Sequence, residues 1–265
     1  MKKLLFLILL IVFTKVTIRA QGELDEQQRV FYRNERTVAI SLNSNGYGIG
    51  YREGKRLDFL NKRIFDVELS ILKHPKELKL TNPYVQVGNS FVFGKLNNVF
   101  TLKGSIGHQK ELFKKKDLGG ISIKYFYSGG PTLAFTKPIY YNVLYPVAGN
   151  TYELRQEKFN IDIHQPSDIY SRASFFKGTR EIGVVPGLYA KGGFNFEYSK
   201  EDRIIHAIEL GLSAEAYINR IPIMAGDNNK ALFLNLFVCY RIGYVVDPFD
   251  PDSSKIPRLF SRRQK

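Results

Sequence analysis

The sequence predicts an all-β protein, a transmembrane antiparallel up-and-down β-barrel of about eight strands. Three observations predict this fold. Apolar and polar residues alternate with a period of two in eight segments, as they do in a strand whose two faces meet different surroundings. After the first twenty residues, no segment reaches eighteen apolar residues without a charge, so no spanning helix is predicted. The predicted links are long on one side and short on the other.

The chain of 265 residues begins with the pattern of a secretory signal peptide at residues 1–20. Two lysines precede an apolar run from Leu4 to Phe13, which is too short to cross a bilayer as a helix. We predict cleavage after Ala20, and a retained membrane anchor is the alternative. Residues 21–36 then form a charged and polar segment on the periplasmic side.

Composition limits the partners of the exported chain. The net charge is +14, and four of these positive charges lie in the signal segment, which leaves +10 on the mature chain. A basic exported protein meets anionic lipid phosphates, polyanionic glycans or an acidic protein partner, whereas export removes it from nucleic acid. Cys239 is the single cysteine, so an internal disulfide is excluded. The 16 tyrosines, 20 phenylalanines and 22 glycines suit strands and turns.

Alternation is clearest in two segments near the carboxyl end, Ala207–Ala216 and Leu232–Tyr244. The second carries leucines, valine, isoleucine and tyrosines at every other position, and that face would promote aggregation in water. Against lipid the same face is favourable. Six further segments alternate in the same way, at about 38–43, 47–52, 65–71, 100–106, 121–135 and 188–198. The predicted barrel therefore spans residues 37–247.

A soluble eight-stranded barrel with a ligand cavity, of the lipocalin kind, is the alternative fold. In such a barrel the apolar residues line the inside, and alternation alone does not distinguish the two arrangements. Two features favour lipid on the outside. The apolar face is long and nearly uncharged in every strand, and the polar face is rich in the small residues that suit a narrow interior.

The links between the predicted strands give an independent criterion. With a periplasmic amino terminus, the inward links are short, at about 53–62, 108–119 and 199–203. Beyond a first tight turn, the outward links are longer, at about 74–97, 137–186 and 218–230. This asymmetry is typical of barrels in the outer membrane of bacteria. We therefore expect a location in the cell outer membrane, in contact with outer-membrane lipid and lipopolysaccharide.

The polar face carries ten charged residues, five basic and five acidic, that are predicted to point into the lumen. They are Arg52, Asp66, Glu68, Lys103, Lys124, Lys191, Glu197, Glu209, Glu215 and Arg241. Buried charges must be paired, and an eight-stranded barrel leaves no wide channel, so we predict a structural ion-pair network that fills the lumen. A proton or ion path, or acid–base work by a carboxylate pair, is the alternative. Glu209 and Glu215 lie roughly 20 Å apart along one strand, too far for such a pair.

No catalytic, metal or cofactor site is predicted. His74, His108, His164 and His206 have no metal-ligand spacing and no acidic cluster beside them. Ser105 and His108 lie near one strand end, as the surface serine and histidine of a lipid hydrolase or acyltransferase would, but no third group completes a catalytic set.

The longest outward link and the carboxyl-terminal tail are the predicted interaction segments. Residues 138–181 are expected to fold over the barrel mouth as a lid or a partner surface, with aromatic residues Tyr140, Tyr141, Tyr145, Tyr152 and Tyr170. Residues 248–265 form a basic periplasmic tail. Its predicted contacts with a periplasmic protein or lipid phosphates come from Arg258, Arg262, Arg263 and Lys265, and a disordered tail is the alternative.

Three segments, Ser41–Arg56, Lys73–Glu77 and Tyr125–Gly130, resemble a family of small outer-membrane barrel proteins of Bacteroidota. The resemblance implies the fold and the location and carries no known activity. Bacteria of that group use barrel proteins in gliding and type IX secretion complexes, so membership of such a complex is a hypothesis by analogy.

The function predicted from the sequence is that of a non-enzymatic outer-membrane barrel, a structural or interaction subunit of an envelope complex with a protein partner. A lipid-modifying enzyme of the outer membrane and a narrow channel are the alternatives.

Overall fold

The computed structural model describes residues 34–82, 84, 90–115, 120–147, 151–199, 203–226 and 229–246. The predicted signal peptide and the predicted basic tail lie outside these residues. Most of the segment predicted as periplasmic, 21–36, lies outside them as well. Its last three residues are described, and they belong to the first strand, which begins at Asn34.

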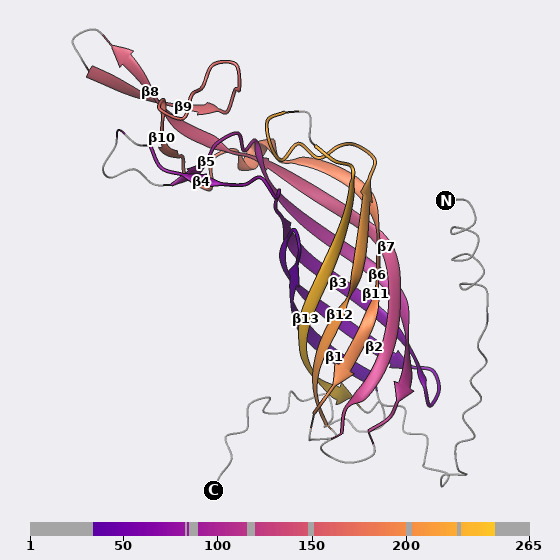
Figure 1. Ribbon diagram of the computed structural model, residues 1–265. Helices are drawn as coiled ribbons and strands as arrows, with labels where there is room; N and C mark the ends of the chain where they lie inside the picture. The colour runs from indigo at the N-terminus through magenta and orange to yellow at the C-terminus, as the bar shows by residue number, and fades with distance from the viewer. Residues whose placement is uncertain are drawn as a thin grey trace, which may run out of the picture. The chain divides into compact units, whose positions relative to one another are not determined.

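Eight antiparallel strands close into a barrel in which each strand pairs with its neighbours along the chain and the last pairs with the first (Figure 1). They are β1 (Asn34–Asn43), β2 (Gly46–Arg56), β3 (Asn61–Leu72), β6 (Asn97–Phe113), β7 (Ser122–Pro138), β11 (Gly183–Glu197), β12 (Ile204–Tyr217) and β13 (Leu232–Val246). The closing pair of β1 and β13 runs without interruption from Asn34 opposite Val246 to Asn43 opposite Phe237. The prediction of an up-and-down barrel of eight strands is confirmed, with strands longer than the alternating cores that predicted them.

The links follow the predicted asymmetry. The three inward links are short, at 57–60, 114–121 and 198–203, and the outward links are 44–45, 73–96, 139–182 and 218–231. The first outward link is a tight turn that places Gly46 against β3. A Cβ atom at Gly46 would lie 1.8 Å from the carbonyl oxygen of Ile71, so only glycine fits this close approach.

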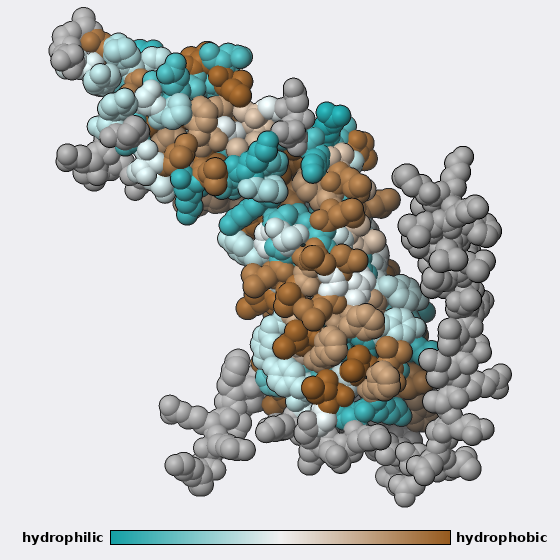
Figure 2. Space-filling model, in the orientation of Figure 1, coloured by the Kyte–Doolittle hydropathy of each residue, from teal (hydrophilic) through white to brown (hydrophobic). Residues whose placement is uncertain are grey.

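The barrel is apolar outside and polar inside. Leu212, Leu234 and Leu236 on the outer wall are 64 %, 72 % and 66 % exposed, whereas the inward Glu209 is 0 % exposed. Figure 2 shows hydrophobic residues over much of the barrel wall that faces the viewer. This arrangement is opposite to that of a soluble lipocalin-like barrel, and it identifies a transmembrane barrel with lipid around its wall. Among the described residues, no helix is long and apolar enough to cross a membrane.

Two small sheets form within the outward links. In the link 73–96, β4 (Lys79–Leu80) pairs with β5 (Phe91–Val92). In the link 139–182, β8 (Tyr140–Val147) is the centre of a three-stranded sheet with β9 (Thr151–Lys158) and β10 (Ile169–Arg172), and a short 3₁₀ helix, η1 (Thr179–Glu181), precedes β11. No alternating pattern predicts strands in these links.

Because the outer wall faces lipid, a charge placed on it is expected to destabilise the barrel. Leu210 lies near the middle of β12 and is 43 % exposed. We predict that Leu210→Arg lowers the free energy of unfolding by about 2–4 kcal/mol, measured by urea denaturation of the protein in lipid vesicles. The matched control is Leu154→Arg, on β9 beyond the barrel, where Leu154 is 52 % exposed. There a change below about 0.5 kcal/mol is expected. Equal effects of the two substitutions would contradict a lipid-facing wall.

Candidate functional site

The lumen of the barrel is organised around the carboxylate of Glu209 on β12. Arg241 binds both of its oxygens, with Nε 3.1 Å from Oε1 and Nη2 3.1 Å from Oε2. Arg52 donates to Oε1 from Nη1 at 2.5 Å, and Asn195 donates to the same oxygen at 2.9 Å. The other edge of the Arg52 guanidinium binds Asp66 at 2.6 and 2.9 Å. Two cations and two anions therefore form a neutral layer, with hydrogen bonds replacing the lost hydration.

A second neutral layer lies toward the outward end. Lys103 binds Glu215 at 2.8 Å and Glu68 at 3.4 Å, and Lys191 binds Glu68 at 3.3 Å. The hydroxyl of Tyr217 donates to Glu215 at 2.6 Å. Lys103 is on β6 and Glu215 is on β12, with β7 and β11 between them around the wall, so their contact crosses the lumen.

A third layer lies toward the inward end. Lys124 and Lys115 both bind Glu197, at 2.5 and 2.9 Å, and Lys62 binds Glu35. The structure thus places all ten charged residues predicted for the lumen in three layers of ion pairs. Three further members of this layer, Lys62, Glu35 and Lys115, were not predicted, because they lie in predicted links and in the predicted terminal segment. Continuing the alternation of β1 and β3 to the strand ends would have found Glu35 and Lys62.

The outward end of the lumen is covered by the link 218–231. Ile221 and Ile223 from this link are 0 % and 1 % exposed and pack on Leu72, Val99 and Tyr217 of the barrel. The lumen cover therefore comes from residues 218–231, whereas the segment 138–181, expected to fold over the mouth, packs elsewhere. Between the middle and inward layers lies a cavity of about 10 Å³, enough for about one water molecule. These layers and this cover leave no room for a wide pore.

Three outward links form one packed unit, which we call the outward extension: the described residues of 73–96, 139–182 and 221–226. Its core consists of buried apolar side chains from the first two links, Phe91, Ile139, Tyr141, Val143, Phe159 and Ile169. Ala225 from the third link packs against this core, and its amide donates to the carbonyl oxygen of Gly94 at 2.6 Å. Figure 1 shows β8, β9 and β10 beyond the end of the barrel, beside β4 and β5. The extension therefore has its own hydrophobic core.

Two side chains join the first two links through backbone groups. The hydroxyl of Tyr141 lies 2.8 Å from the carbonyl oxygens of both Val92 and Lys95, and burial raises the pKa of Tyr141 well above its ordinary value. The side-chain amide of Asn82 donates to the carbonyl oxygens of Ser167 and Ile169, at 2.8 and 2.9 Å. These buried hydrogen bonds fix the links against each other.

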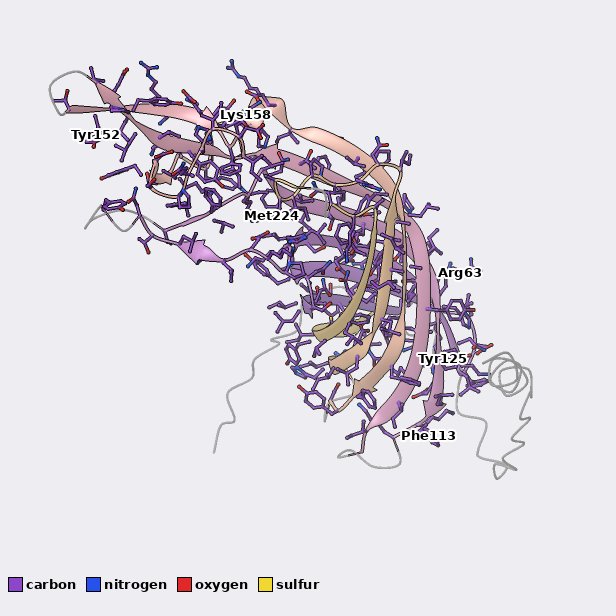
Figure 3. The ribbon with its side chains drawn as sticks, turned by 45° about the horizontal axis from the view of Figure 1, so that its top comes forward. Arg63, Phe113, Tyr125, Tyr152, Lys158 and Met224 are labelled. Atoms are coloured by element: carbon purple, nitrogen blue, oxygen red, sulfur yellow. The ribbon has the colours of Figure 1, made fainter. Side chains whose placement is uncertain are left out.

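The five tyrosines predicted for the longest link do not form one surface. Tyr141 belongs to the core, and Tyr170 is half-buried. Tyr140 donates to Glu181 at 2.7 Å and Tyr145 donates to Glu157 at 2.9 Å, and each hydrogen bond raises the pKa of its phenol. Tyr152, near the end of the β8–β9 hairpin, is 66 % exposed. Figure 3 labels it at the far tip of the extension.

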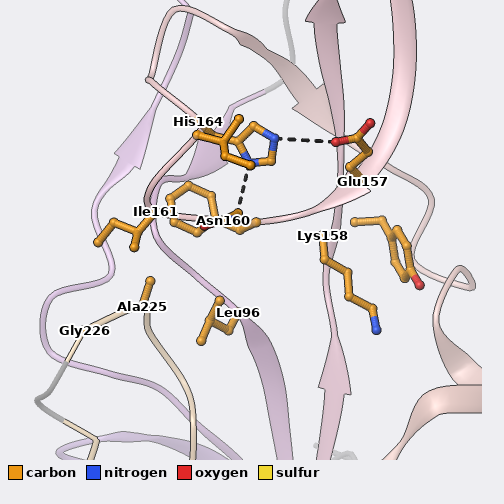
Figure 4. Close-up of a pocket in the computed structure, with 11 residues that line it drawn as sticks. Leu96, Glu157, Lys158, Asn160, Ile161, His164, Ala225 and Gly226 are labelled. Carbon is orange, nitrogen blue, oxygen red and sulfur yellow. Dashed lines mark hydrogen bonds and ion pairs between the residues drawn. The ribbon is translucent and has the colours of Figure 1, made fainter.

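A groove of about 760 Å³ lies in the outward extension and is open to solvent (Figure 4). Its walls are mainly apolar, with Ile161 and Ile163 58 % and 63 % exposed. It is lined by Leu96, Tyr140, Glu157, Lys158, Phe159, Asn160, Ile161, Ile163, His164, Ala225 and Gly226. This size is within the range of ligand sites, although the groove is shallow.

His164 is a buried residue in the lining of this groove. Its side chain is 3 % exposed, and its Nδ1 accepts a hydrogen bond from the amide of Asn160 at 3.0 Å, so the neutral ring carries its proton on Nε2. Nε2 lies 3.7 Å from Glu157 Oε2, beyond hydrogen-bond range, and has no hydrogen-bond partner among the described residues. The groove therefore combines exposed aliphatic side chains with a buried histidine whose Nε2 lies near the Glu157 carboxylate.

The residues considered for catalysis or metal binding are separated. Ser105 donates to Ser128 at 3.3 Å inside the barrel, whereas His108 lies 3.0 Å from the side-chain oxygen of Asn61. In the described part of the chain, no group of three or more His, Cys, Asp or Glu residues could hold a metal ion. The predicted tail contacts Arg258, Arg262, Arg263 and Lys265 lie outside the described residues.

Comparisons with known proteins give distant structural similarities. No family model and no curated protein matches the chain. Neisserial surface protein A is 9 % identical, with 80 % of this chain and 96 % of that chain covered and a TM-score of 0.36. The attachment invasion locus protein Ail of Yersinia pestis is 8 % identical, with 81 % and 99 % covered and a TM-score of 0.38. The N-terminal β-barrel domain of Pseudomonas aeruginosa OprF is 6 % identical, with 82 % and 99 % covered and a TM-score of 0.33. The fold assignment rests on the strand pairing of this chain, and no residue role is taken from these structures.

Loss of one charge from the layer around Glu209 is expected to destabilise the barrel strongly. Glu209→Gln leaves Arg52 and Arg241 buried without their shared carboxylate. We predict a loss of about 3–5 kcal/mol in the free energy of unfolding, measured by urea denaturation in vesicles. The control is Arg36→Gln, which breaks the exposed ion pair with Glu53 and should cost less than about 1 kcal/mol. If both variants lost the same stability, the Glu209 layer would not hold the lumen together.

Proposed function

We propose that this chain is a non-enzymatic structural and interaction subunit of an outer-membrane complex. The barrel is the membrane anchor, and the outward extension binds a protein partner. One observation carries this proposal. Buried apolar side chains and hydrogen bonds to backbone groups hold the three outward links together as a folded unit. That unit still presents exposed apolar residues to solvent. Exposed apolar patches on a folded unit are typical of interaction sites.

The filled lumen favours a role as a membrane anchor over a role as a channel. Ion pairs cross the lumen in three layers, and Ile221 and Ile223 cover its outward end. An ion path would need a continuous open space along the lumen. In the described residues, paired side chains occupy that space. We therefore propose that binding takes place outside the lumen.

Two features of the outward extension are suited to a partner. In the order β10–β8–β9, one edge of β9 pairs with no strand among the described residues, and Tyr152 and Leu154 on this strand are 66 % and 52 % exposed. Open strand edges accept an extended segment of another chain. The groove adds the exposed side chains of Ile161 and Ile163, so it suits a segment that brings an apolar side chain.

The resemblance of three sequence segments to small barrel proteins of Bacteroidota favours a particular setting. In that group, gliding and type IX secretion complexes contain barrel proteins, so we propose these complexes as the first to test. This part of the proposal rests on the resemblance of Ser41–Arg56, Lys73–Glu77 and Tyr125–Gly130.

Affinity purification of the full, tagged chain from native membranes in mild detergent tests the proposal. We predict that Ile161→Asp with Ile163→Asp lowers the amount of copurifying partner about tenfold or more, because two charges enter the apolar wall of the groove. Quantitative mass spectrometry of the purified material measures the change.

The matched control introduces two aspartates at exposed apolar positions of other outward links. Ile218→Asp with Leu78→Asp is suitable, since these side chains are 76 % and 72 % exposed and do not line the groove. Partner recovery should stay unchanged in this control. Isolation of the unaltered chain as a lone monomer, or equal losses in both double variants, would contradict the proposal.

A further inference from the structure

Three basic side chains lie on the lipid-facing wall near the inward end of the barrel. They are Lys55 on β2, Arg63 on β3 and Lys110 on β6. Each occupies the strand face that carries exposed apolar residues farther along. Phe65 lies two residues from Arg63 and Ile106 lies four residues from Lys110, and their side chains are 41 % and 61 % exposed. Because the two faces of a strand alternate, these cations point away from the lumen.

Strand register places two of these cations directly opposite each other. Lys55 pairs with Arg63 between β2 and β3, and Arg63 pairs with His108 between β3 and β6. Lys110 is two residues from His108 on the same face. Directly opposite side chains have Cβ atoms about 4.5–5.5 Å apart, and like charges at that spacing destabilise a sheet. A counterion between Lys55 and Arg63 would remove this repulsion.

The protein itself supplies no such counterion in its described part. Lys55, Arg63 and Lys110 make no side-chain hydrogen bond or ion pair with any described residue. The nearby carboxylates are engaged. Glu53 binds Arg36 at 3.3 Å, and Asp58 accepts four hydrogen bonds at 2.7–2.9 Å, two from the Leu60 and Asn61 backbone amides and two from the Asn61 side chain. The described residues therefore leave these three cations without an anionic partner, a place that an anion bound from outside the chain can fill.

The depth of the cluster in the membrane indicates which anion is available. Apolar residues lie outward of it at Phe65 and Ile106 and inward of it at Leu112, and aromatic residues flank it. Tyr125 pairs with Lys110, and Tyr127 is 58 % exposed with its ring 6.0 Å from that of His108. Tyrosines mark the boundary between hydrocarbon and headgroups. Figure 3 shows Arg63 and Tyr125 on the same side of the barrel. From these tyrosines we infer that the cations lie at the level of the lipid phosphates in the periplasmic leaflet.

We propose that Lys55, Arg63 and Lys110 bind the headgroup of an anionic glycerophospholipid in the periplasmic leaflet. One phosphate between Lys55 and Arg63 relieves their repulsion, and the planar guanidinium binds two phosphate oxygens at once. The acyl chains lie against Phe65 and Ile106. This site uses the barrel wall alone, so it stands whether or not the outward extension binds a protein partner.

The chain contains no tryptophan, so a single introduced tryptophan reports on the lipid beside it. Phe65→Trp places the reporter at the proposed site. Ile208→Trp is the matched reporter on β12. Phe65 and Ile208 are 41 % and 40 % exposed, and each lies four residues from the inward start of its strand, at Asn61 and Ile204. Full chains are reconstituted in bilayers of phosphatidylcholine and phosphatidylglycerol, in which one lipid or the other carries brominated acyl chains that quench tryptophan fluorescence.

We expect phosphatidylglycerol to be enriched about fivefold or more over its bulk fraction at Phe65→Trp, and to match its bulk fraction at Ile208→Trp. Equal quenching ratios at the two reporters would overturn the site. Inorganic phosphate at constant ionic strength should leave the enrichment unchanged, and loss of the enrichment would assign the site to free phosphate.

Charge reversal at one position separates binding from folding. Lys55→Glu, made with Phe65→Trp, gives Arg63 a partner within the sheet, so the barrel should stay folded, as judged by heat-dependent migration in gels. The enrichment should fall to the bulk value. Lys55→Gln with Arg63→Gln serves as a second variant with the same expected loss. Enrichment that persists in the folded variants would overturn the proposal.

Discussion

The rest of this barrel depends on the ion pairs that the Glu209 carboxylate forms with Arg52 and Arg241. This carboxylate is 0 % exposed in the lumen and binds guanidinium groups from β2 and β13. It therefore links strands that lie at different positions around the barrel. A chain that turns its apolar side chains toward lipid must place its polar ones in a narrow interior, and there each charge needs a partner. The layers above and below Glu209 meet the same requirement with lysines and glutamates. The outer wall can therefore be apolar over most of its height.

Because side chains fill the lumen, other molecules can bind only at the outer surfaces of the protein. Side chains occupy the interior, and Ile221 and Ile223 cover its outward end, so the surfaces open to other molecules are the outer wall and the outward extension. The extension is a folded unit in its own right, because Tyr141 and Asn82 tie two links together and Ala225 adds the third. The barrel wall adds a second surface, the three cations near the inward end that have no ion-pair partner among the described residues. We propose that the first surface binds a protein partner and the second binds membrane lipid, and neither role depends on transport through the barrel.

The sequence was sufficient to predict the membrane-spanning part, because a two-residue period is a local signal and lipid selects one face along each whole strand. The same rule located the lumen charges such as Glu209 and Arg241. It did not predict β8, β9 and β10, where the core forms between links far apart in the chain and Tyr141 packs with Phe91. It also did not predict that Ile221 and Ile223 cover the lumen, because a short irregular link has no period. The approach of His164 Nε2 to the Glu157 carboxylate depends on distances that only the folded extension provides.

Hydrogen exchange of the full chain in lipid bilayers, followed by mass spectrometry, tests the central claim most directly. That claim is that the outward links form one folded unit on a sealed barrel. The account predicts that amides in Tyr140–Val147 exchange far more slowly than those of an unstructured peptide, and that Tyr141→Phe accelerates exchange in that strand and around Val92 together. Exchange in the outward links as fast as in an unstructured peptide, with the barrel strands still protected, would contradict the account.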